Sequence, residues 1–533
     1  MCQKDKKHQD PNSQAHHEEH EAWSRRTFLQ ALGIAGAGTF TLAGSQISSA
    51  MASPITAALN SSTNDRVLVL IRLKGGNDGL NTIVPLNDYS TYAAGRPNIA
   101  LAQNTLYNLD VNNGLPNFMS SLQSRWGNGE MKVIHGVGYP NQDLSHFRSS
   151  DIWATTDPVT PLETGWMGRF FENEYPNFVL SPPAIPPAIQ IGSLGNLAFE
   201  GLQTNYAFSV ADPNQLAQLA QNGWQHDALN VPPCTYGDQL SYLRTTTNTT
   251  FAYAGVINNA FMASATQANY NNNTIAEQLA LVARLIKGNL GTKVYMVTLG
   301  GFDTHANQAS RHANRMQQLT DAIDEFYTDL AGLGIQNEVL AMTISEFGRR
   351  VEENGSNGTD HGAAAPMMMF GPGLNGNGFI GTQPSLTQLD AAGNMIHSVD
   401  FRDIYSTVMK EWLCIPAATV DQAMLSSFNT INLGFNCTTL GATDVSDLDF
   451  KHIVINRDEH AILNISLDTA RKMDIRIFNF MGQELGQLKN DYMMPGNHEI
   501  NIKQTLQTRM PSGVYIYRIE TGGKQYSNQF LMR

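Results

Sequence analysis

Three short segments combine acidic residues with histidines in a pattern that suits a divalent metal ion. They read GGFDTHANQ, SEFGRR and GTDHGAAAP, and their ligand-type side chains are Asp303, His305, Glu346, Asp360 and His361. Imidazole nitrogens and carboxylate oxygens are ligands of Zn, and carboxylate oxygens also bind Ca and Mg. Because the segments are far apart in the sequence, folding must bring them together.

Apolar runs of strand type precede the segments and set where the acids would lie. Runs at 294–299 and 339–344 lead into the first two segments, and RVLVLIRL at 66–73 leads into a glycine-rich turn that contains Asp78. If these strands are neighbours in a parallel sheet, the acids converge at its carboxyl edge, where open α/β sheets place their sites. Asp78 therefore joins the expected ligands of one or two divalent ions, which would support displacement at phosphorus or sulfur.

Each of these side chains also has a structural interpretation. An Asp that follows a strand is often the N-cap of the next helix, which applies to Asp78 and Asp303. Glu346 or His361 could equally be a hydrogen-bonded structural group. The placement of all of them at expected strand ends favours the metal site.

The segment DLSHFRSSDIWATTD supplies a candidate nucleophile. Ser145 stands where a helix is expected to begin, so its hydroxyl would meet the positive end of the helix dipole. Arg148, one turn further on, would hold an anionic ester, and His146 is a second candidate as a ligand or a general acid. The alternative is that Ser145 only caps the helix.

The alternation of strands and helices predicts an α/β fold. Thr274 and Glu277 form a capping-box pattern at the start of a helix whose apolar residues recur at helical spacing, and this helix leads into the strand at 294–299. A second apolar pattern of helical spacing, at 316–330, leads into the strand at 339–344. This repeated unit predicts a doubly wound, mainly parallel sheet. Met367 to Phe370 is expected to add a short strand, and FRDIYSTVMKEWL a late amphipathic helix.

Composition narrows the class of partner. The formal charge is -13 and only 15% of residues are charged, which argues against nucleic acid, whose phosphates require a basic surface.

The expected α/β domain spans 53–440. Within it, residues 162–273 are rich in Asn, Gln, Thr and Gly, which predicts long irregular connections or an inserted cap. Of the cysteines expected in the mature chain, Cys234, Cys414 and Cys437, the last two are a candidate disulfide.

The N-terminus has the pattern of an export signal. Residues 24–29 read SRRTFL, the run ALGIAGAGTFTLAG follows, and Ala-Met-Ala at 50–52 is a small-residue cleavage site. This predicts a twin-arginine signal peptide over 1–52, whose route carries folded proteins; the alternative is an ordinary surface helix. The rest of the chain offers no charge-free stretch long enough for a membrane span, so we expect a soluble mature protein.

The C-terminal segment, 445–533, changes to short alternating apolar runs separated by turns, which predicts a small antiparallel β-sandwich. Through IFNFMGQEL, SGVYIYRI and the closing KQYSNQFLMR it resembles the C-terminal sorting domain of type IX secretion in the Bacteroidetes phylum. The resemblance implies export by that machinery to the cell surface or the medium. The alternative is a carbohydrate-binding or adhesive sandwich.

The central segments also resemble a family. LKGGNDGLNTIVP, SHFRSSDIWATTD, GGFDTHANQ, ISEFGRR, GTDHGAAAPMMMFGPGL and VDFRDIYSTVMKEWL are similar to domain-of-unknown-function family 1501, a set of exported bacterial proteins of the alkaline phosphatase and sulfatase superfamily. The resemblance covers most of 66–413. It implies the superfamily fold and metal-dependent hydrolysis of phosphate or sulfate esters.

The superfamily pattern is matched incompletely. Asp78 matches its strand-end Asp ligand, but the Asp-x-x-x-His pair that begins at Asp303 has its histidine two residues on, with Asn307 in the expected place. Its Asp-His pair falls on Glu346 and Phe347, so one histidine ligand would be missing.

The last histidine ligand of the superfamily matches His361, which precedes a Pro and a Gly-Pro-Gly turn. In an alternative register Asp360 and His361 are the Asp-His pair and His397 is the last ligand. Two functions therefore stay open, a metal-dependent ester hydrolase in which Ser145 attacks, and a binding protein whose altered site holds a structural ion or a polysaccharide.

Overall fold

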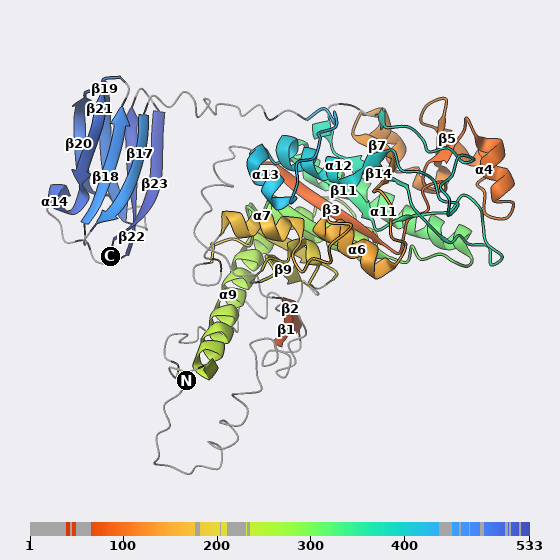
Figure 1. Cartoon of the computed structure of the whole chain (residues 1–533), viewed down its shortest axis with the longest axis horizontal. Coiled ribbons are helices and arrows are strands. Elements are labelled where there is room, and N and C mark those ends of the chain that lie inside the picture. Colours follow the sequence, from red (N-terminus) through yellow and green to blue (C-terminus); the bar gives the residue numbers. More distant parts are fainter. Residues whose placement is uncertain are drawn as a thin grey trace, which may run out of the picture. The chain divides into compact units, whose positions relative to one another are not determined.

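The structure is a computed structural model that falls into two compact units, Met1–Thr438 and Thr439–Arg533 (Figure 1). The residues it describes are 39–42, 45–48, 65–175, 178, 182–193, 195–202, 204–210, 231, 235–374, 376, 378–435, 437, 450–457, 460–467, 469–479, 484–506, 510, 513–521 and 524–532. Among these residues, no helix has both the length and the apolar character needed to cross a membrane.

An 11-stranded sheet forms the centre of the first unit, in the order β1-β2-β9-β8-β10-β3-β11-β14-β7-β15, with β16 beside β7. The segment from β9 to β11 is parallel throughout, and β14 is antiparallel to both β11 and β7. The prediction of a doubly wound, mainly parallel sheet is confirmed. The strands are β1 (Thr39–Leu42), β2 (Ser45–Ser48), β3 (Val67–Lys74), β7 (Met131–Gly138), β8 (Ala188–Ile191), β9 (Ala207–Val210), β10 (Val294–Gly300), β11 (Val339–Ser345), β14 (Ala365–Phe370), β15 (Gly378–Ile380) and β16 (Val399–Asp400).

Strand β3 occupies the middle of this sheet because its sequence is apolar on both faces. Its residues 67–71 are all buried, with Leu70 in register with Met296 of β10 and Met342 of β11. A strand covered by helices on both sides loses the alternation of a half-exposed strand and becomes a continuous apolar run. The three strands predicted to lead into the acidic segments are therefore direct neighbours.

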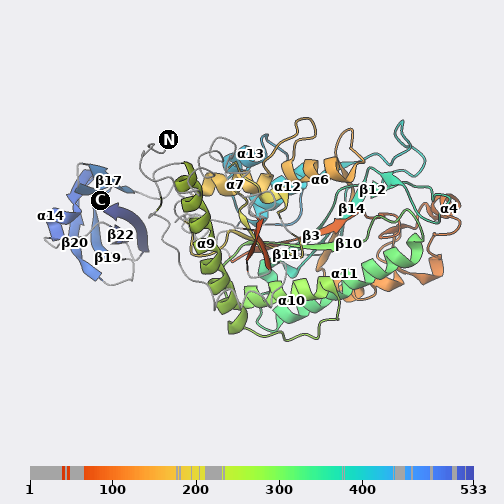
Figure 2. The same cartoon turned by 90° about the horizontal axis from the view of Figure 1, so that it is seen from below.

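Helices cover both faces of the sheet (Figure 2). Helices α10 (Thr274–Lys287) and α11 (Gln308–Ala331) lie on one side of β3, β10 and β11. The other side carries α6 (His146–Thr155), α7 (Trp166–Glu174), α12 (Phe401–Thr407) and α13 (Ala417–Ala423). The late helix expected at 401–413 is α12, which continues as a π-helical turn over Val408–Trp412.

The start of α10 differs by one residue from the expected capping box. Asn273, rather than Thr274, is the N-cap, and its side chain accepts a hydrogen bond from the Ala276 N–H at 3.1 Å. Asn and Thr are both good caps, so a Thr-x-x-Glu pattern directly after an Asn does not decide between them.

Residues 162–273 are more regular than their composition suggests. They contain α7, the two sheet strands β8 and β9, and the 29-residue helix α9 (Thr235–Ala263). The expectation of long irregular connections is wrong for these elements. Strands β8 and β9 have four residues each and are buried throughout, so they show no alternation that would distinguish them from loop.

Smaller elements complete the first unit. A three-stranded sheet joins β4 (Val84–Pro85), β6 (Asn113–Pro116) and β5 (Leu106–Asn108), and a two-stranded sheet joins β12 (Gly348–Arg349) and β13 (His361–Gly362). Two short helices are α4 (Tyr89–Gly95) and α5 (Leu122–Gly127). The proposed disulfide between Cys414 and Cys437 is present, whereas Cys234 lies outside the described residues.

The second unit consists of two antiparallel sheets, as predicted for the C-terminal segment. One has the order β17-β18-β21 and the other β20-β19-β22-β23. Buried aliphatic residues such as Leu463, Ile465, Ile475 and Ile477 form its own core. Its elements are β17 (Phe450–Arg457), β18 (His460–Leu467), β19 (Arg471–Asn479), β20 (Glu484–Met493), β21 (Gly496–Asn501), α14 (Ile502–Leu506), β22 (Gly513–Thr521) and β23 (Lys524–Met532).

Most of the expected signal peptide, including the arginine pair, lies outside the described residues. Its described parts are β1 and β2, which form a hairpin, and β2 pairs with β9 at the edge of the central sheet. The twin-arginine signal therefore stays a prediction.

Candidate metal centre

The carboxyl ends of β10, β3 and β11 carry the acidic part of the site. Asp303 lies three residues beyond the end of β10, and Glu346 directly follows β11. Between them, the backbone N–H of Gly75, the first residue after β3, donates to Glu346 Oε1 at 2.7 Å. The strand order thus brings two of the predicted acids to one edge of the sheet.

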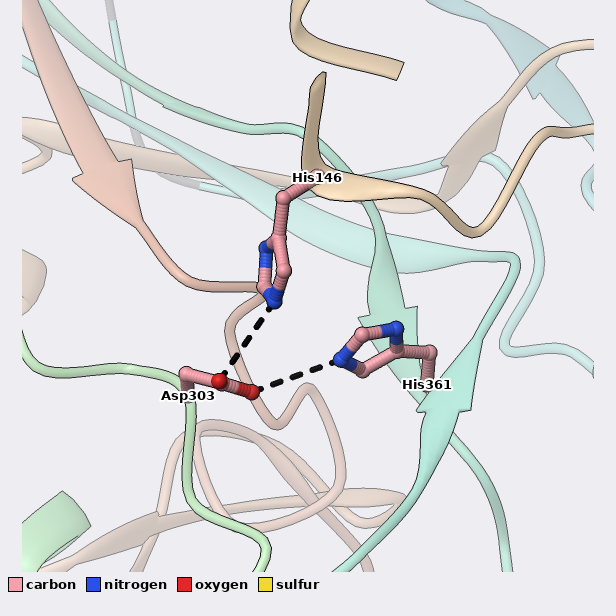
Figure 3. Close-up of side chains that lie close together, drawn as sticks. All are labelled: His146, Asp303 and His361. Atoms are coloured by element: carbon pink, nitrogen blue, oxygen red, sulfur yellow. Dashed lines mark hydrogen bonds and ion pairs between the residues drawn. The ribbon is translucent and has the colours of Figure 1, made fainter. Parts of the chain in front are cut away.

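Two histidines meet Asp303 from other elements (Figure 3). His146, the first residue of α6, places Nε2 3.5 Å from Asp303 Oδ2, and His361 of β13 places Nε2 3.3 Å from Asp303 Oδ1. Each of the three residues offers a ligand atom within 4.8 Å of the other two. This spacing allows one ion to be held by all three.

The outer nitrogens of both histidine rings are occupied by acceptors. His361 Nδ1 lies 2.7 Å from the Leu144 carbonyl oxygen, and His146 Nδ1 lies 3.1 Å from Glu346 Oε1. Both acceptors call for a proton on Nδ1, so a neutral ring in either position would direct its Nε2 lone pair at Asp303. Metal-ligating histidines are held in this way, by a carboxylate or a backbone carbonyl on the far nitrogen.

His305 extends the cluster. Its Nε2 lies 3.2 Å from Asp303 Oδ1 and 3.0 Å from His361 Nε2, and its Nδ1 lies 3.2 Å from Asp360 Oδ1. Like the other two rings it has an acceptor beside Nδ1, here a carboxylate, and its other nitrogen is turned to Asp303 and His361. Asp360, which is exposed, thus orients His305 from outside the group formed by His146, Asp303 and His361.

Electrostatics keep the site in a form that can bind a cation. Burial raises the pKa of Asp303. The hydrogen bond and charge of Arg349, together with smaller contributions from His361 and His146, outweigh burial and lower this pKa to about 2. Burial also lowers the pKa of His361 from its ordinary value. A charged carboxylate and a neutral imidazole are the states that a metal ligand needs.

Arg349 is the residue that fixes the Asp303 carboxylate. Its guanidinium is fully buried and donates to Asp303 Oδ1 at 2.8 Å, and also to the carbonyl oxygens of Gly75, Gly76, Phe302 and Thr359. Five acceptors satisfy a planar group that cannot lose its charge. The turns after β3 and β10 are therefore tied to the segment that carries His361.

Asp78 lies in a separate buried network. Its Oδ2 accepts from Arg96 Nη1 at 2.7 Å and from Gln308 Nε2, and its Oδ1 accepts from the Leu80 N–H at 3.2 Å. Burial raises the pKa of Asp78, but the Arg96 charge and hydrogen bond lower it to a net value below the ordinary one. The structure gives it protein partners on both oxygens and does not bring it into the metal-type group.

Of the residues proposed for catalysis, the structure brings only His146 to the cluster. Ser145 is exposed at the N-cap of α6, as the sequence placed it, and Arg148 donates to the Pro158 carbonyl oxygen at 3.1 Å. Neither Ser145 nor Arg148 lines the cavity beside the cluster. His397, the last ligand of the alternative register, lies beside Gly138 and outside the group.

A cavity of about 790 Å³ opens beside the cluster, and His146, Asp303 and Glu346 line one part of it. This volume lies within the range of small-molecule sites, about 300–1,000 Å³. Its polar lining includes two cations from β3, a hydroxyl and a carboxylate from α6, and side chains from the β8 region, namely Arg72, Lys74, Ser150, Asp151, Gln190, Ser193 and Asn196.

Further residues at the site stand at positions that the sequence pattern marks as unusual. Arg72 and Lys74 are two apart at the end of an otherwise apolar strand, so they share a face, and Arg349 stands three residues after Glu346. Phe347 has its ring centroid 4.9 Å from that of His146 and 4.3 Å from that of His361. The Phe347 ring therefore contacts both histidine rings.

Comparison with solved structures gives low similarity over much of the chain. Ps i-CgsB in complex with k-i-k-neocarrahexaose is 9% identical with a TM-score of 0.28, covering 76% of this chain and 83% of that one. A protein of the alkaline phosphatase superfamily from Vibrio parahaemolyticus is 8% identical with a TM-score of 0.26, covering 84% and 82%. Alkaline phosphatase from the Antarctic bacterium TAB5 is 10% identical with a TM-score of 0.23, covering 60% and 95%.

Family models match two parts of the chain, while no curated protein matches it in sequence. Residues 241–420 match the protein family of unknown function DUF1501, and residues 459–533 match the secretion system C-terminal sorting domain. The second match covers most of the β-sandwich unit and indicates export to the cell surface or the medium. The chain thus contains a region that matches the DUF1501 family, followed by a type IX secretion sorting domain.

Proposed function

We propose that this exported protein is a metal-dependent hydrolase of phosphate or sulfate esters, with the ion held by His146, Asp303 and His361. One observation carries the proposal. The Nε2 atoms of these histidines converge on one carboxylate while their Nδ1 atoms are held by acceptors. With Nδ1 protonated, a neutral ring at each position turns its Nε2 lone pair toward the same carboxylate, an arrangement that a shared cation would satisfy.

The donor set favours Zn²⁺ among the ions expected from the sequence. Two or three imidazole nitrogens with one carboxylate oxygen match zinc ligands, whereas Ca²⁺ and Mg²⁺ take oxygen ligands almost exclusively. Three protein ligands are typical of catalytic zinc sites, which keep a further position open. The cavity adjoins the group on the side of His146 and Asp303, where a substrate would enter.

The side chains of this site suit hydrolysis of an anionic ester. A bound ion would polarise an ester oxygen and lower the pKa of a water molecule. Hydrolysis forms a bond from the water oxygen to phosphorus or sulfur, breaks the bond to the alcohol oxygen, and transfers one proton from the water to the alcohol. Glu346 Oε2 is buried, lacks a hydrogen-bond partner among the described residues and belongs to a cavity-lining residue, so it is the atom we assign to hold that proton.

Water is the nucleophile that this geometry favours. Ser145, the nucleophile proposed from the sequence, is exposed and does not line the cavity. A Ser145→Ala variant should therefore keep its turnover. Loss of turnover in that variant, with unchanged metal content, would instead support attack by Ser145 through a covalent intermediate.

The test uses the full chain folded in the cytoplasm and loaded with Zn²⁺. Metal content is measured by mass spectrometry, and hydrolysis is measured on a panel of aryl phosphates and aryl sulfates. We expect bound zinc and turnover on one class of ester, with both lost in Asp303→Asn. The control is His498→Ala, because His498 belongs to the sorting domain. A protein that binds no metal and leaves the whole panel intact would rule out the hydrolase.

The second candidate is a surface protein that binds an ion or a polysaccharide without catalysis. Phe347 favours it, because a phenyl ring stands where the superfamily pattern has a histidine ligand. Bound metal together with an inert panel would support this function and reject the first.

A further inference from the structure

The cavity has a cationic region set apart from the histidine cluster. Arg72 and Lys74 lie on the same face of β3, and both line the cavity. Arg72 Nη2 donates to Ser150 Oγ at 3.1 Å, which joins the strand to α6, and Ser150 also lines the cavity. The metal-site proposal uses neither Arg72 nor Ser150.

Residue positions along β3 and along α6 give two independent backbone spacings between the Arg72–Ser150 pair and the histidine cluster. Gly75 N contacts Glu346 beside the cluster, and Arg72 lies three residues earlier on β3, where each residue of a strand rises roughly 3.3 Å. On α6, Ser150 follows His146 by four residues, or roughly 6 Å along a helix. The backbone positions of Arg72 and Ser150 are therefore roughly 6–10 Å from those of Gly75 and His146, which leaves room for a second anionic group beside the scissile one.

The charges of the lining favour a second anion at this pair. Asp303 is paired with Arg349, and Glu346 lies at the cluster, where its Oε1 accepts from Gly75 and His146, so neither acid belongs to the region of Arg72 and Ser150. Asp151 is the remaining acid of the lining, and it lies close enough to Arg72 for their charges to interact. Arg72 and Lys74 thus outnumber the one acid that opposes an anion there.

We propose that the cavity binds substrates with two anionic groups, the scissile ester at the histidine cluster and a second phosphate or sulfate held by Arg72, Ser150 and Lys74. Arg72 supplies a planar donor, Ser150 a hydroxyl and Lys74 a mobile charge at the end of the strand. The inference rests on the proposed function for the role of the cluster, but the second subsite is tested by binding alone.

The experiment compares matched ligands with one and two anionic groups. Zinc-loaded full chain is titrated calorimetrically with glucose 6-phosphate and glucose 1,6-bisphosphate, and with methyl galactoside 6-sulfate and 2,6-disulfate. We expect at least about tenfold tighter binding of the two-anion ligand in one pair. The pair that shows this preference distinguishes phosphate from sulfate.

Three variants assign the preference to the subsite. Arg72→Gln should remove the preference while leaving the one-anion affinity within about twofold, and Asp151→Asn should increase it, because an opposing charge is lost. Arg311→Gln, an exposed arginine on α11 outside the cavity lining, should behave as wild type.

The outcomes separate this inference from the proposed function. Equal binding of one-anion and two-anion ligands, binding of neither, or an Arg72→Gln variant that keeps the preference would overturn the second subsite. Turnover on the aryl ester panel would still support the hydrolase in each of these cases. A gain of affinity in Asp151→Asn cannot come from misfolding, so it keeps the test decisive if Arg72→Gln is unstable.

Discussion

His361 faces Asp303 with one ring nitrogen and the Leu144 backbone with the other. Nε2 lies 3.3 Å from Asp303 Oδ1, and Nδ1 lies 2.7 Å from the carbonyl oxygen. The carbonyl can only accept, so it holds the proton on Nδ1 and leaves a lone pair on Nε2. This arrangement is the one expected of two ligands of the proposed metal ion, and it can be tested directly.

Replacing His361 should weaken metal binding. His361→Ala removes one ligand of the group, and we expect zinc affinity to fall by at least about tenfold, since even loss of an outer partner of a ligand costs 10–100-fold. Affinity is measured by competition with a chromogenic chelator. His498→Ala should retain wild-type affinity, and a His361→Ala variant that matches it would remove His361 from the site.

His397 distinguishes the two superfamily registers. It lies beside Gly138 and outside the group of His146, Asp303 and His361. His397→Ala should therefore leave zinc affinity within about twofold of wild type in the same chelator assay. A loss as large as that of His361→Ala would favour the alternative register, in which His397 is the last ligand.

Replacing Glu346 should lower both the zinc affinity and the turnover. Glu346→Gln keeps an acceptor for His146 Nδ1 but removes the charge and the proton-accepting Oε2. We expect a 10–100-fold loss of zinc affinity from the weaker hold on His146, and a further loss of kcat in zinc-saturated protein.

Measuring kcat at saturating zinc separates these two effects. Glu353→Gln is the control, because Glu353 binds Asn98 and Ile99 away from the cluster. If zinc-saturated Glu346→Gln has wild-type kcat, Glu346 only positions His146.

Replacing Gln308 should lower both the free energy of unfolding and the zinc affinity of the histidine cluster. It is fully buried, accepts from the hydroxyls of Thr304 and Thr359, and donates to Asp78. Gln308→Leu removes a shared acceptor from both hydroxyls and one donor from buried Asp78, which keeps Arg96, and we expect a loss of about 2–4 kcal/mol in the free energy of unfolding.

Denaturant unfolding measures this loss, and Gln317→Leu, on the exposed side of α11, is the control. Zinc affinity should also fall in Gln308→Leu, because Thr304 and Thr359 belong to the loops that carry His305 and His361. Stability equal to that of Gln317→Leu would contradict the role of Gln308.

Two buried histidines should make the fold sensitive to mild acid. Burial lowers the pKa of His135 and of His312 from 6.5 to about 4, against the opposing charges of Asp110 and Asp78. Both are neutral in the folded protein, so the unfolded chain binds more protons below pH 6.5. Stability from these groups is complete above about pH 6.5 and decreases as the pH falls to about 4.

The His135 contribution can be isolated by substitution. Its two ring nitrogens are buried and lack hydrogen-bond partners among the described residues, and its ring stacks on Phe379. His135→Leu should lose less stability than wild type between pH 6.5 and pH 4, by at most roughly 3 kcal/mol. Unfolding in denaturant at each pH gives the two curves, and parallel curves would show that His135 does not contribute.

The sequence by itself determined the elements that are long or strongly patterned. The apolar run at 66–73 predicted a buried strand, and the stripe that includes Met316, Leu319 and Ile323 predicted a helix, because period and hydrophobicity are local properties. The short buried strands β8 and β9 carry no such period, so they were missed.

Only the tertiary structure decided which side chains meet. Asp78 and Asp303 both follow strands of the central sheet, yet Asp78 is turned into a buried pair with Arg96, while Asp303 faces His146 and His361. Strand order and the contacts of Arg349 and Gln308 determine these positions. Such contacts join residues far apart in the sequence, and no local pattern encodes them.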